Sequence, residues 1–156
     1  MKLNRVIKSF FLLAILIHYP SYCIPRIVGL IPAKNESLIL AQCLRALSLF
    51  TDAIIYLDDA STDNSVDIVK SLAKECKVEA IIEKDQWYRN EPADRNRLLE
   101  EGRKVGGTHF IVIDADEILT SNCLKDNFLR NKILSLNPGD TLKLNWITLW
   151  RSVDYY

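Results

Sequence analysis

The sequence predicts an α/β fold in which a mostly parallel, Rossmann-like sheet is flanked by helices. Short apolar runs rich in β-branched residues alternate along the chain with segments of helical periodicity. These runs are apolar almost throughout, as is typical of strands buried on both faces of a parallel sheet. Acidic residues follow several of the runs, and the ligands of such sheets bind where the strands end.

Each expected strand is a short run of β-branched and other apolar residues, found at residues 26–31, 53–57, 78–82 and 109–113. Helices are expected over residues 38–50, 63–76, 93–105 and 122–136, and the first two of these carry apolar side chains at helical spacing. Residues that cap helices or form turns stand at the boundaries, namely Ser37, Thr62 or Asp63, Gly106-Gly107 and Asn137-Pro138-Gly139. A last strand is expected over residues 141–150.

The composition fits a single globular domain. A chain of 156 residues that is 49% hydrophobic can bury a core, which excludes a disordered tail or a fibre. Its 20 basic and 20 acidic residues balance, so we expect no nucleic-acid partner. Beyond residue 25 there are 17 basic and 20 acidic residues, and an anionic ligand would therefore require a metal ion or a few well-placed cations.

Residues 1–25 have the layout of a signal peptide or a short membrane anchor. Lys2, Arg5 and Lys8 precede an apolar run at residues 10–17, which is shorter than the roughly 20 residues that span a bilayer. The residues up to Cys23 lack the small-x-small pattern of a cleavage site. A cleaved signal, an uncleaved anchor and a buried first element all remain open, and we expect the domain to begin at residue 26.

The four cysteines do not form a recognisable metal site. Cys23, Cys43, Cys76 and Cys123 are widely spaced, whereas zinc sites cluster their sulfur and imidazole ligands. Cys43 lies in an apolar helical pattern and is expected in the core. Unpaired thiols favour a reducing compartment, which conflicts with an export signal.

Acidic residues gather where the expected strands end. They are Glu36 after the first strand, Asp58 and Asp59 after the second, and Asp114, Asp116 and Glu117 after the fourth. Parallel strands end at one edge of a sheet, so these carboxylates repel one another unless a cation or hydrogen-bond donors lie among them. Asp114 and Asp116 suit a hard divalent cation such as Mg²⁺ or Mn²⁺. The alternative for this segment is helix capping by Asp116 and Glu117.

Two further groups are candidates for ligand binding. Asp59 precedes the helix cap, where its carboxylate would accept a hydrogen bond from a base or a sugar; a purely structural turn is the alternative. Arg95 and the free N–H groups of the first helical turn suit a diphosphate, unless this is an exposed helix start with a local Asp94–Arg97 pair. The aromatic residues 87–88 either stack on a ligand or anchor their loop on the core.

Four segments together resemble the family 2 glycosyltransferases of the GT-A fold, in order and in approximate spacing. They are residues 31–36 (Ile-Pro-Ala-Lys-Asn-Glu), 58–63 (Asp-Asp-Ala-Ser-Thr-Asp), 95–96 (Arg-Asn) and 113–117 (Ile-Asp-Ala-Asp-Glu). The stretch from Trp87 to Glu117 looks most like the bacterial subgroup that includes the lipopolysaccharide-core glucosyltransferases. The resemblance covers about residues 26–125.

The resemblance implies an inverting transfer of a sugar from a nucleotide-diphosphate donor, preferably a UDP-sugar, to a hydroxyl of a saccharide or lipid-linked acceptor. The implied nucleotide-sugar-binding residues are Pro32, Ala33, Lys34, Glu36, Asp59, Arg95 and Asp114. Within this set, Asp59 would bind the base and Arg95 would lie near the diphosphate. Asp114 would face the ribose or a metal-bound water, while Asp116 would hold the Mg²⁺ or Mn²⁺ that bridges the phosphates. Lys34 replaces an aromatic residue of many members and would instead approach a phosphate.

In this family, the part of the chain after the metal-binding acids binds the acceptor and supplies the general base. Forty residues follow Asp116, and neither Asp140 nor Asp154 has motif support as a base, so no catalytic base is assigned. We therefore expect a GT-A domain over residues 26–156 whose acceptor half is missing, either a fragment or a truncated member. A non-catalytic nucleotide-sugar-binding module is the alternative.

Two other enzyme classes share part of the pattern. Haloacid-dehalogenase-type phosphatases use the first aspartate of a D-x-D motif as nucleophile, but they place it near the chain start and follow it with Thr or Val, where this chain has Ile118. A nucleotidyltransferase on a similar sheet would require a glycine-rich, basic loop after the first strand, which residues 32–36 do not provide.

The expected location follows from the N-terminus and the donor. The segment 1–25 indicates a membrane-associated or exported protein. Nucleotide sugars are expected in the cytosol, which favours the cytosolic face of a membrane.

Overall fold

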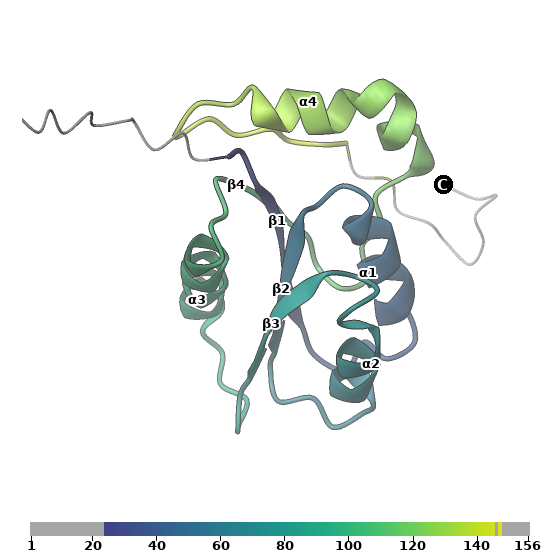
Figure 1. Cartoon of the computed structure of the whole chain (residues 1–156). Helices are drawn as coiled ribbons and strands as arrows, with labels where there is room; N and C mark the ends of the chain where they lie inside the picture. The colour runs from purple at the N-terminus through teal and green to yellow at the C-terminus, as the bar shows by residue number, and fades with distance from the viewer. Residues whose placement is uncertain (1–23, 146, 148–156) are drawn as a thin grey trace, which may run out of the picture.

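A computed structural model of the protein describes residues 24–145 and 147, in which a parallel sheet lies between helices (Figure 1). The strands are β1 (Ile27–Ala33), β2 (Ala53–Asp58), β3 (Val78–Glu83) and β4 (His109–Val112). The helices are α1 (Leu40–Ser48), α2 (Ser65–Leu72), α3 (Glu91–Lys104), the 3₁₀ helix η1 (Ser121–Asn127) and α4 (Phe128–Leu134). The predicted fold class is confirmed.

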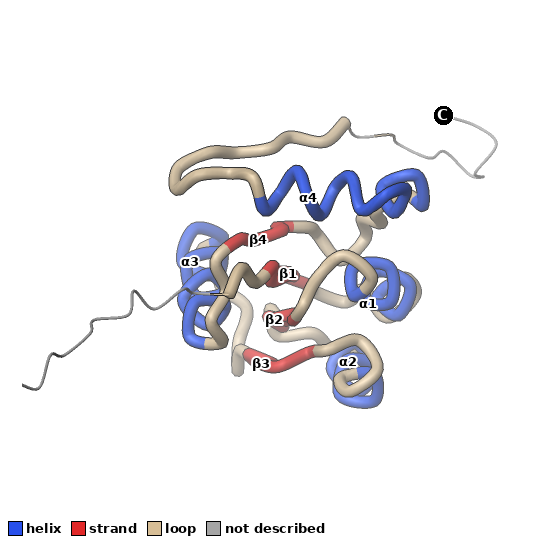
Figure 2. The backbone as a smooth tube through the Cα atoms, turned by 45° about the horizontal axis from the view of Figure 1, so that its top comes forward, coloured by secondary structure: helices blue, strands red, loops and turns tan. Residues whose placement is uncertain are grey.

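The sheet has the strand order β3-β2-β1-β4, and every pairing in it is parallel (Figure 2). Val28 of β1 lies beside Ala53 on one side and Phe110 on the other. Helices α1 and α2 cover one face of the sheet and α3 covers the other (Figures 1 and 2). Because the strands run in the same direction, the loops that follow β1, β2 and β4 emerge at one edge.

The core has a layer on each side of the sheet. One layer joins the α1–α2 face to alternate strand residues such as Ile31 and Tyr56, and the other joins α3 to residues such as Leu30. This two-sided burial explains the nearly continuous apolar runs, since each fully buried aliphatic side chain contributes about 1.5–3 kcal/mol. Cys43 is buried in the first layer as predicted, and burial, followed by the charges of Asp116 and Glu117, raises the pKa of its thiol to about 12.

Helix α4 lies across the end of the sheet opposite to these loops (Figure 1). Leu129 and Ile133 pack against Ile27 at the start of β1. Arg130 donates hydrogen bonds to both carboxylate oxygens of Asp52, at 2.9 and 3.0 Å, just before β2 begins. The helix therefore closes the amino end of the sheet and leaves the carboxyl end open.

The predicted helix over residues 122–136 is wrong in its first half. That segment forms η1, and α4 follows after two residues with left-handed backbone, Asp126 and Asn127, both at φ 54°. Asp and Asn tolerate this conformation better than other non-glycine residues, so they break the helical run that the apolar periodicity predicts. The predicted turn at residues 137–139 is confirmed, with Gly139 at φ +94°.

The predicted strand over residues 141–150 is wrong where the structure describes it. Residues 141–145 and 147 have no strand pairing, and the rest of that segment lies outside the described residues. Leu142 instead packs with the α4 cluster, so burial rather than ladder formation explains its apolar character.

The first two helices begin differently from the prediction. Helix α1 starts at Leu40 without a side-chain cap, and the Ser37 backbone N–H instead donates to Asp63 Oδ2 at 3.0 Å. Asn64 occupies the N-cap position of α2, while Asp63 Oδ1 accepts from the Ser65 N–H at 2.9 Å. The polar residues at these boundaries thus tie two loops together.

The proposed signal or anchor, residues 1–25, lies almost wholly outside the described residues. Within residues 24–145 and 147, none of the helices has the length and apolar character needed to cross a membrane.

Candidate functional site

All eight residues predicted to bind a donor or a metal line a single cavity of about 410 Å³ at the carboxyl end of the sheet. They are Pro32, Ala33, Lys34, Glu36, Asp59, Arg95, Asp114 and Asp116, and they are joined by Leu57, Glu91, Asp94 and Ala115. The loops after β1, β2 and β4 and the start of α3 supply these side chains. Parallel strand direction alone brings segments up to 84 residues apart in sequence to this edge.

The loops after β1 and β2 are locked together by hydrogen bonds. The backbone N–H groups of Asn35 and Glu36 donate to the hydroxyls of Ser61 and Ser65, at 2.9 and 3.0 Å. In return, the Thr62 N–H donates to Asn35 Oδ1 at 2.7 Å. The serine, threonine and Asp63 side chains of the 58–65 segment therefore hold the first loop in place rather than facing a ligand.

Asp63 is held ionised by this network. Slight burial acts to raise the pKa of its carboxyl, but hydrogen bonds from Ser65 and Ser37 outweigh it and lower the pKa well below the usual range. The carboxylate thus strengthens the bonds that join the two loops.

The adjacent aspartates Asp58 and Asp59 have different environments. Asp58 is buried, accepts from the Ser61 N–H at 2.8 Å and lies 3.3 Å from the Tyr56 hydroxyl, so it is structural. Asp59 lines the cavity. Its Oδ1 lies 2.5 Å from Lys84 Nζ, a contact with ionic but not hydrogen-bond geometry, so this buried oxygen accepts no regular hydrogen bond from the described residues.

Lys84 is the residue that the sequence analysis missed. Its side chain is 3% exposed and contacts both Asp59 and Asp94, the latter at 2.9 Å. Asp94 therefore pairs with Lys84 and not with Arg97, so the alternative of a local Asp94–Arg97 pair is wrong. A lysine directly after a strand, at the sheet edge where acids gather, is the pattern that would have revealed it.

Arg95 and Asp114 form an ion pair across the cavity, with Nη2 and Oδ1 3.3 Å apart and both side chains about half exposed. Glu117 accepts from the Asp114 N–H at 3.0 Å and closes a turn, so its role is structural. Asp116 is exposed, and its carboxylate forms neither a hydrogen bond nor an ion pair with the residues that the structure describes.

Lys34 does not extend freely towards a phosphate. Its Nζ donates to the carbonyl oxygens of Asp59 and Ala60, at 2.8 and 3.2 Å, and lies 5.6 Å from the centre of the Trp87 ring. Trp87 and Tyr88 are 56% and 47% exposed, so neither anchors its loop in the core. Each instead contacts a lysine of the site, Lys34 for Trp87 and Lys84 for Tyr88.

The cavity has excess negative charge. Six carboxylates line it, belonging to Glu36, Asp59, Glu91, Asp94, Asp114 and Asp116, against two cationic side chains, Lys34 and Arg95. Burial and then the nearby charges of Asp116 and Asp63 raise the pKa of Glu36. The lining therefore repels an anionic ligand unless a cation is added.

The residues present fit a cation bound jointly by protein and ligand. Among the described residues, no group of three His, Cys, Asp or Glu side chains forms a complete metal cage. Mg²⁺ and Mn²⁺ do not require one, because Mg²⁺ in particular is usually bound by one or two carboxylates plus water and phosphate oxygens. Asp114 and Asp116 are such carboxylates.

Replacing Glu36 by Gln is expected to stabilise the metal-free protein at pH 7 by less than about 1 kcal/mol. Because the folded-state pKa of Glu36 lies above its ordinary value of 4.5, the folded state binds the proton more tightly. Stability is therefore lost as the pH rises from about 4.5 through the raised pKa, and Gln removes that loss. Urea unfolding in EDTA at pH 7 and pH 4 measures the difference, which should shrink at pH 4.

Glu100→Gln, a change at an exposed position outside the cavity, is the control and should show no such pH dependence. A Glu36→Gln variant that is less stable than wild type at pH 7 would contradict the repulsion inferred for the cavity.

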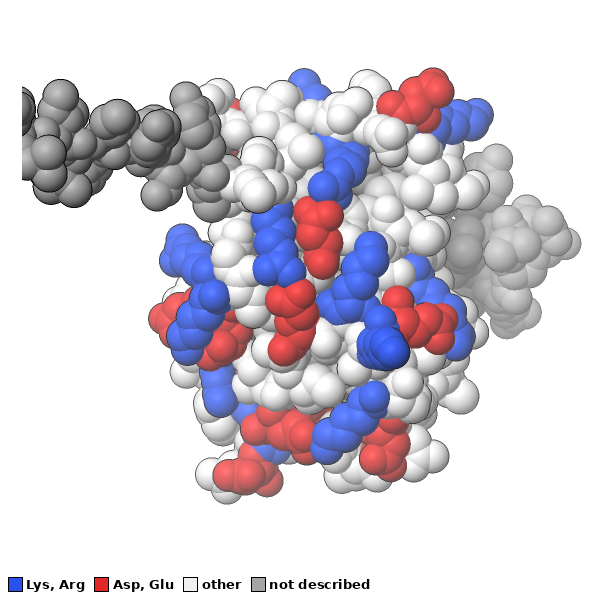
Figure 3. All heavy atoms as spheres, viewed as in Figure 1, with Lys and Arg blue, Asp and Glu red and all other residues white. Residues whose placement is uncertain are grey.

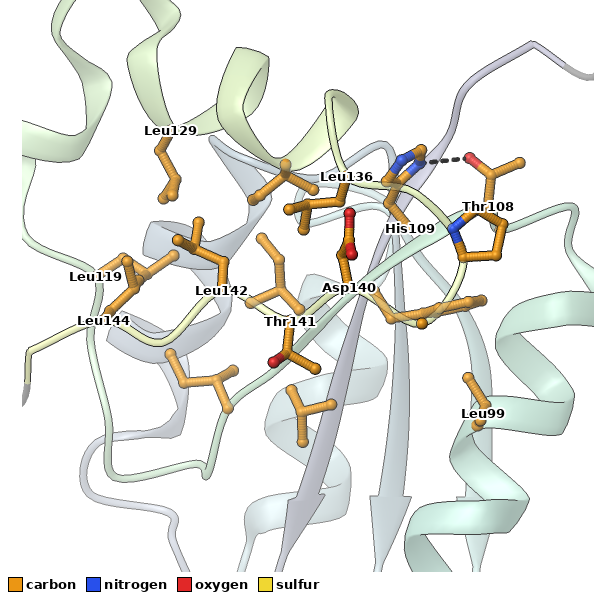
Figure 4. A pocket seen from close by; sticks show the side chains of 18 of the residues that line it. Leu99, Thr108, His109, Leu119, Leu129, Leu136, Asp140, Thr141, Leu142 and Leu144 are labelled. Atoms are coloured by element: carbon orange, nitrogen blue, oxygen red, sulfur yellow. Dashed lines mark hydrogen bonds between the residues drawn. The ribbon is translucent and has the colours of Figure 1, made fainter.

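A second, larger cavity of about 950 Å³ lies beside β4 and α4 (Figure 4). Leucines such as Leu119, Leu129 and Leu142 form part of its lining, and Thr108 Oγ1, also in the lining, lies 2.9 Å from His109 Nδ1. Asp140, also in its lining, accepts from the Asn137 N–H at 2.8 Å within a turn. None of the eight predicted site residues lines it.

The face of the molecule seen in Figure 3 carries basic and acidic side chains in alternation, without a large area of one sign. Strong local charge is instead concentrated in the cavity at the strand ends.

Comparison with protein families gives one match: residues 30–128 fit the model of the family described as glycosyl transferase family 2. Comparison with curated proteins gives no match.

Solved structures with a similar fold include TarS (residues 1–349) of S. aureus in complex with UDP-GlcNAc, at 20% identity and a TM-score of 0.54, covering 67% of this chain and 30% of that one. They also include the mannosyltransferase PcManGT from Pyrobaculum calidifontis in complex with GDP-Man and Mn²⁺, at 21% identity and a TM-score of 0.57, covering 71% and 32%. The chain thus spans about a third of the length of these proteins, and the likeness shows a shared fold.

Proposed function

The chain belongs to glycosyl transferase family 2, and on this premise we propose that it forms the donor-binding part of a metal-dependent glycosyltransferase. The reaction would move a sugar from a nucleotide-diphosphate sugar to an acceptor hydroxyl with inversion. The observation that carries the proposal is the cavity at the carboxyl ends of the strands. Its lining includes Asp59, a carboxylate that can bind a nucleobase, and the two carboxylates of Asp114 and Asp116, which can bind a metal ion.

The nucleoside would bind against the loops after β1 and β2, at the wall formed by residues 32–36 and Asp59. Asp59 would accept a hydrogen bond from the base, because its Oδ2 accepts none from the described residues. Residues 32–36 would form the wall of this part of the cavity, and the interlocked loops would keep that wall rigid. A preformed wall reduces the entropy that ligand binding has to overcome.

The diphosphate would lie near the start of α3. Arg95 donates to Asp114 in the free protein at 3.3 Å, and this half-exposed pair is weak enough to be exchanged for contacts with a ligand. Asp114 would then be available to the ribose or to a metal-bound water.

A divalent ion is the cation that the acidic lining requires. Asp116, with Asp114, would hold Mg²⁺ or Mn²⁺. When bound, such an ion neutralises the diphosphate and stabilises the negative charge that develops as it leaves. The role of the carboxylates is to fix that ion beside the phosphates.

A UDP-sugar is our preferred donor class. TarS is found with UDP and with UDP-GlcNAc, and PcManGT with GDP-Man and Mn²⁺, which supports nucleotide-diphosphate sugars in general. We further propose a saccharide or lipid-linked acceptor and membership of the subgroup nearest the lipopolysaccharide-core glucosyltransferases. The protein would associate with the cytosolic face of a membrane through residues 1–25.

A non-catalytic nucleotide-sugar-binding module is the second candidate. This candidate is favoured by the position of Asp140. Its carboxylate accepts a hydrogen bond within a turn and lines the larger cavity, not the donor cavity, so among the described residues it is not placed to act as a general base for the donor site.

Calorimetric titration with UDP and GDP, with and without Mn²⁺, tests the donor site. We expect binding that strengthens at least tenfold with Mn²⁺, because the ion offsets the charge of the lining. Binding of neither nucleotide under either condition would refute the proposal. Turnover of a UDP-sugar would separate the enzyme from the binding module.

A further inference from the structure

Lys84 lies behind the wall of the donor cavity and contacts two of its acidic residues. Its Nζ lies 2.5 Å from Asp59 Oδ1 and 2.9 Å from Asp94 Oδ2, and the Tyr88 ring centre is 3.9 Å away on a third side. Its backbone N–H donates to the Asp58 carbonyl at 3.1 Å. The ammonium thus joins the loop after β2 to the first turn of α3, while Lys84 itself does not line the cavity.

The arrangement is costly for a purely structural element. A buried lysine and two largely buried carboxylates lose hydration, and apolar residues of similar size often stabilise a fold as well or better. The charges are placed where both acids line a ligand cavity and where the lysine ammonium lies over the Tyr88 ring. Such a placement suits a device that fixes a carboxylate for recognition.

We infer that Lys84 is a positioning residue for nucleobase selection: by holding Asp59 Oδ1, it presents Oδ2 to the cavity as an oriented acceptor. The inference rests on the proposed donor site. An oriented carboxylate favours a base that offers a ring N–H, as uracil and guanine do, and repels a base with a lone pair at that position, as in cytosine and adenine. Lys84 acts through Asp59 and does not touch the ligand.

The test compares two pairs of matched ligands, UDP against CDP and GDP against ADP, by calorimetry with Mn²⁺. Wild-type protein should prefer the N–H-bearing member of at least one pair about tenfold or more, the scale of one well-placed base contact. Lys84→Met should reduce this ratio to near one, and Lys84→Arg should restore most of it. Lys70→Met, which removes the lysine of an exposed ion pair with Glu83, should leave the ratio unchanged.

Because Lys84→Met leaves two acids unpaired, the double variant Lys84→Met with Asp94→Asn is measured beside it, with folding checked by circular dichroism. A merely structural lysine would lower the affinities for both members of a pair equally, and an unchanged ratio in either folded variant would overturn the inference. Metal-dependent binding without any base preference in wild type would also overturn it, while leaving the donor site intact. Failure of all four nucleotides to bind would refute both.

Discussion

Asp116→Asn is expected to weaken Mn²⁺-dependent nucleotide binding by about 100-fold or more. Even residues that only support a metal ligand cost 10–100-fold in affinity when they are replaced, and a direct ligand should cost at least as much. Asn keeps the shape of the side chain and removes the charge that the ion requires. Calorimetry with Mn²⁺ measures the loss, and binding measured in EDTA should be far less affected.

The same substitution should leave stability within about 0.5 kcal/mol of wild type or raise it slightly, because Asp116 is exposed and has no partner among the described residues. Asp126→Asn is the matched control, since Asp126 is exposed, lies outside the cavity and has a left-handed backbone that Asn tolerates. Metal-dependent binding that survives Asp116→Asn would remove Asp116 from the metal site and leave the charge argument for the cavity without support.

The centre of the sheet was predictable because β1 and β2 are buried on both faces. A run such as residues 53–57, flanked by Asp58-Asp59, is compatible with few other structures, and β2 ends one residue later than predicted. The segment after Asp116 was not predictable in the same way. Its apolar residues, such as Leu129 and Leu142, pack in a small cluster around α4. The spacing of apolar residues in the sequence cannot distinguish such a cluster from a longer helix or a strand.

The composition of the candidate site was predictable from topology, whereas its internal pairing was not. Parallel strand ends meet at one edge, so Glu36, Asp59 and Asp114 had to lie near one another once the strands were identified. Which carboxylate pairs with which cation depends on side-chain direction. Asp94 thus faces Lys84, ten residues earlier in the sequence, instead of Arg97 one helical turn later.

Lys84→Met is expected to lower the free energy of unfolding by about 3 kcal/mol, at the lower end of the range for breaking a buried ion pair. Met has nearly the volume of the lysine stem, so the loss comes from Asp59 and Asp94, which would remain largely buried without a counter-ion. The lower end applies because Asp59 is 22% exposed and regains some hydration. Chemical denaturation with urea at pH 7 measures the change.

The cause can be isolated by removing the acids as well. The triple variant Lys84→Met, Asp59→Asn, Asp94→Asn carries no charge at this position, so most of the lost stability should return even though three polar groups have been altered. Lys70→Met breaks only an exposed pair and should change stability by less than about 1 kcal/mol. If the triple variant were no more stable than Lys84→Met, the loss would reflect packing of the lysine stem against Tyr88 and its neighbours. The two carboxylates would then not depend on Lys84 for their charge balance.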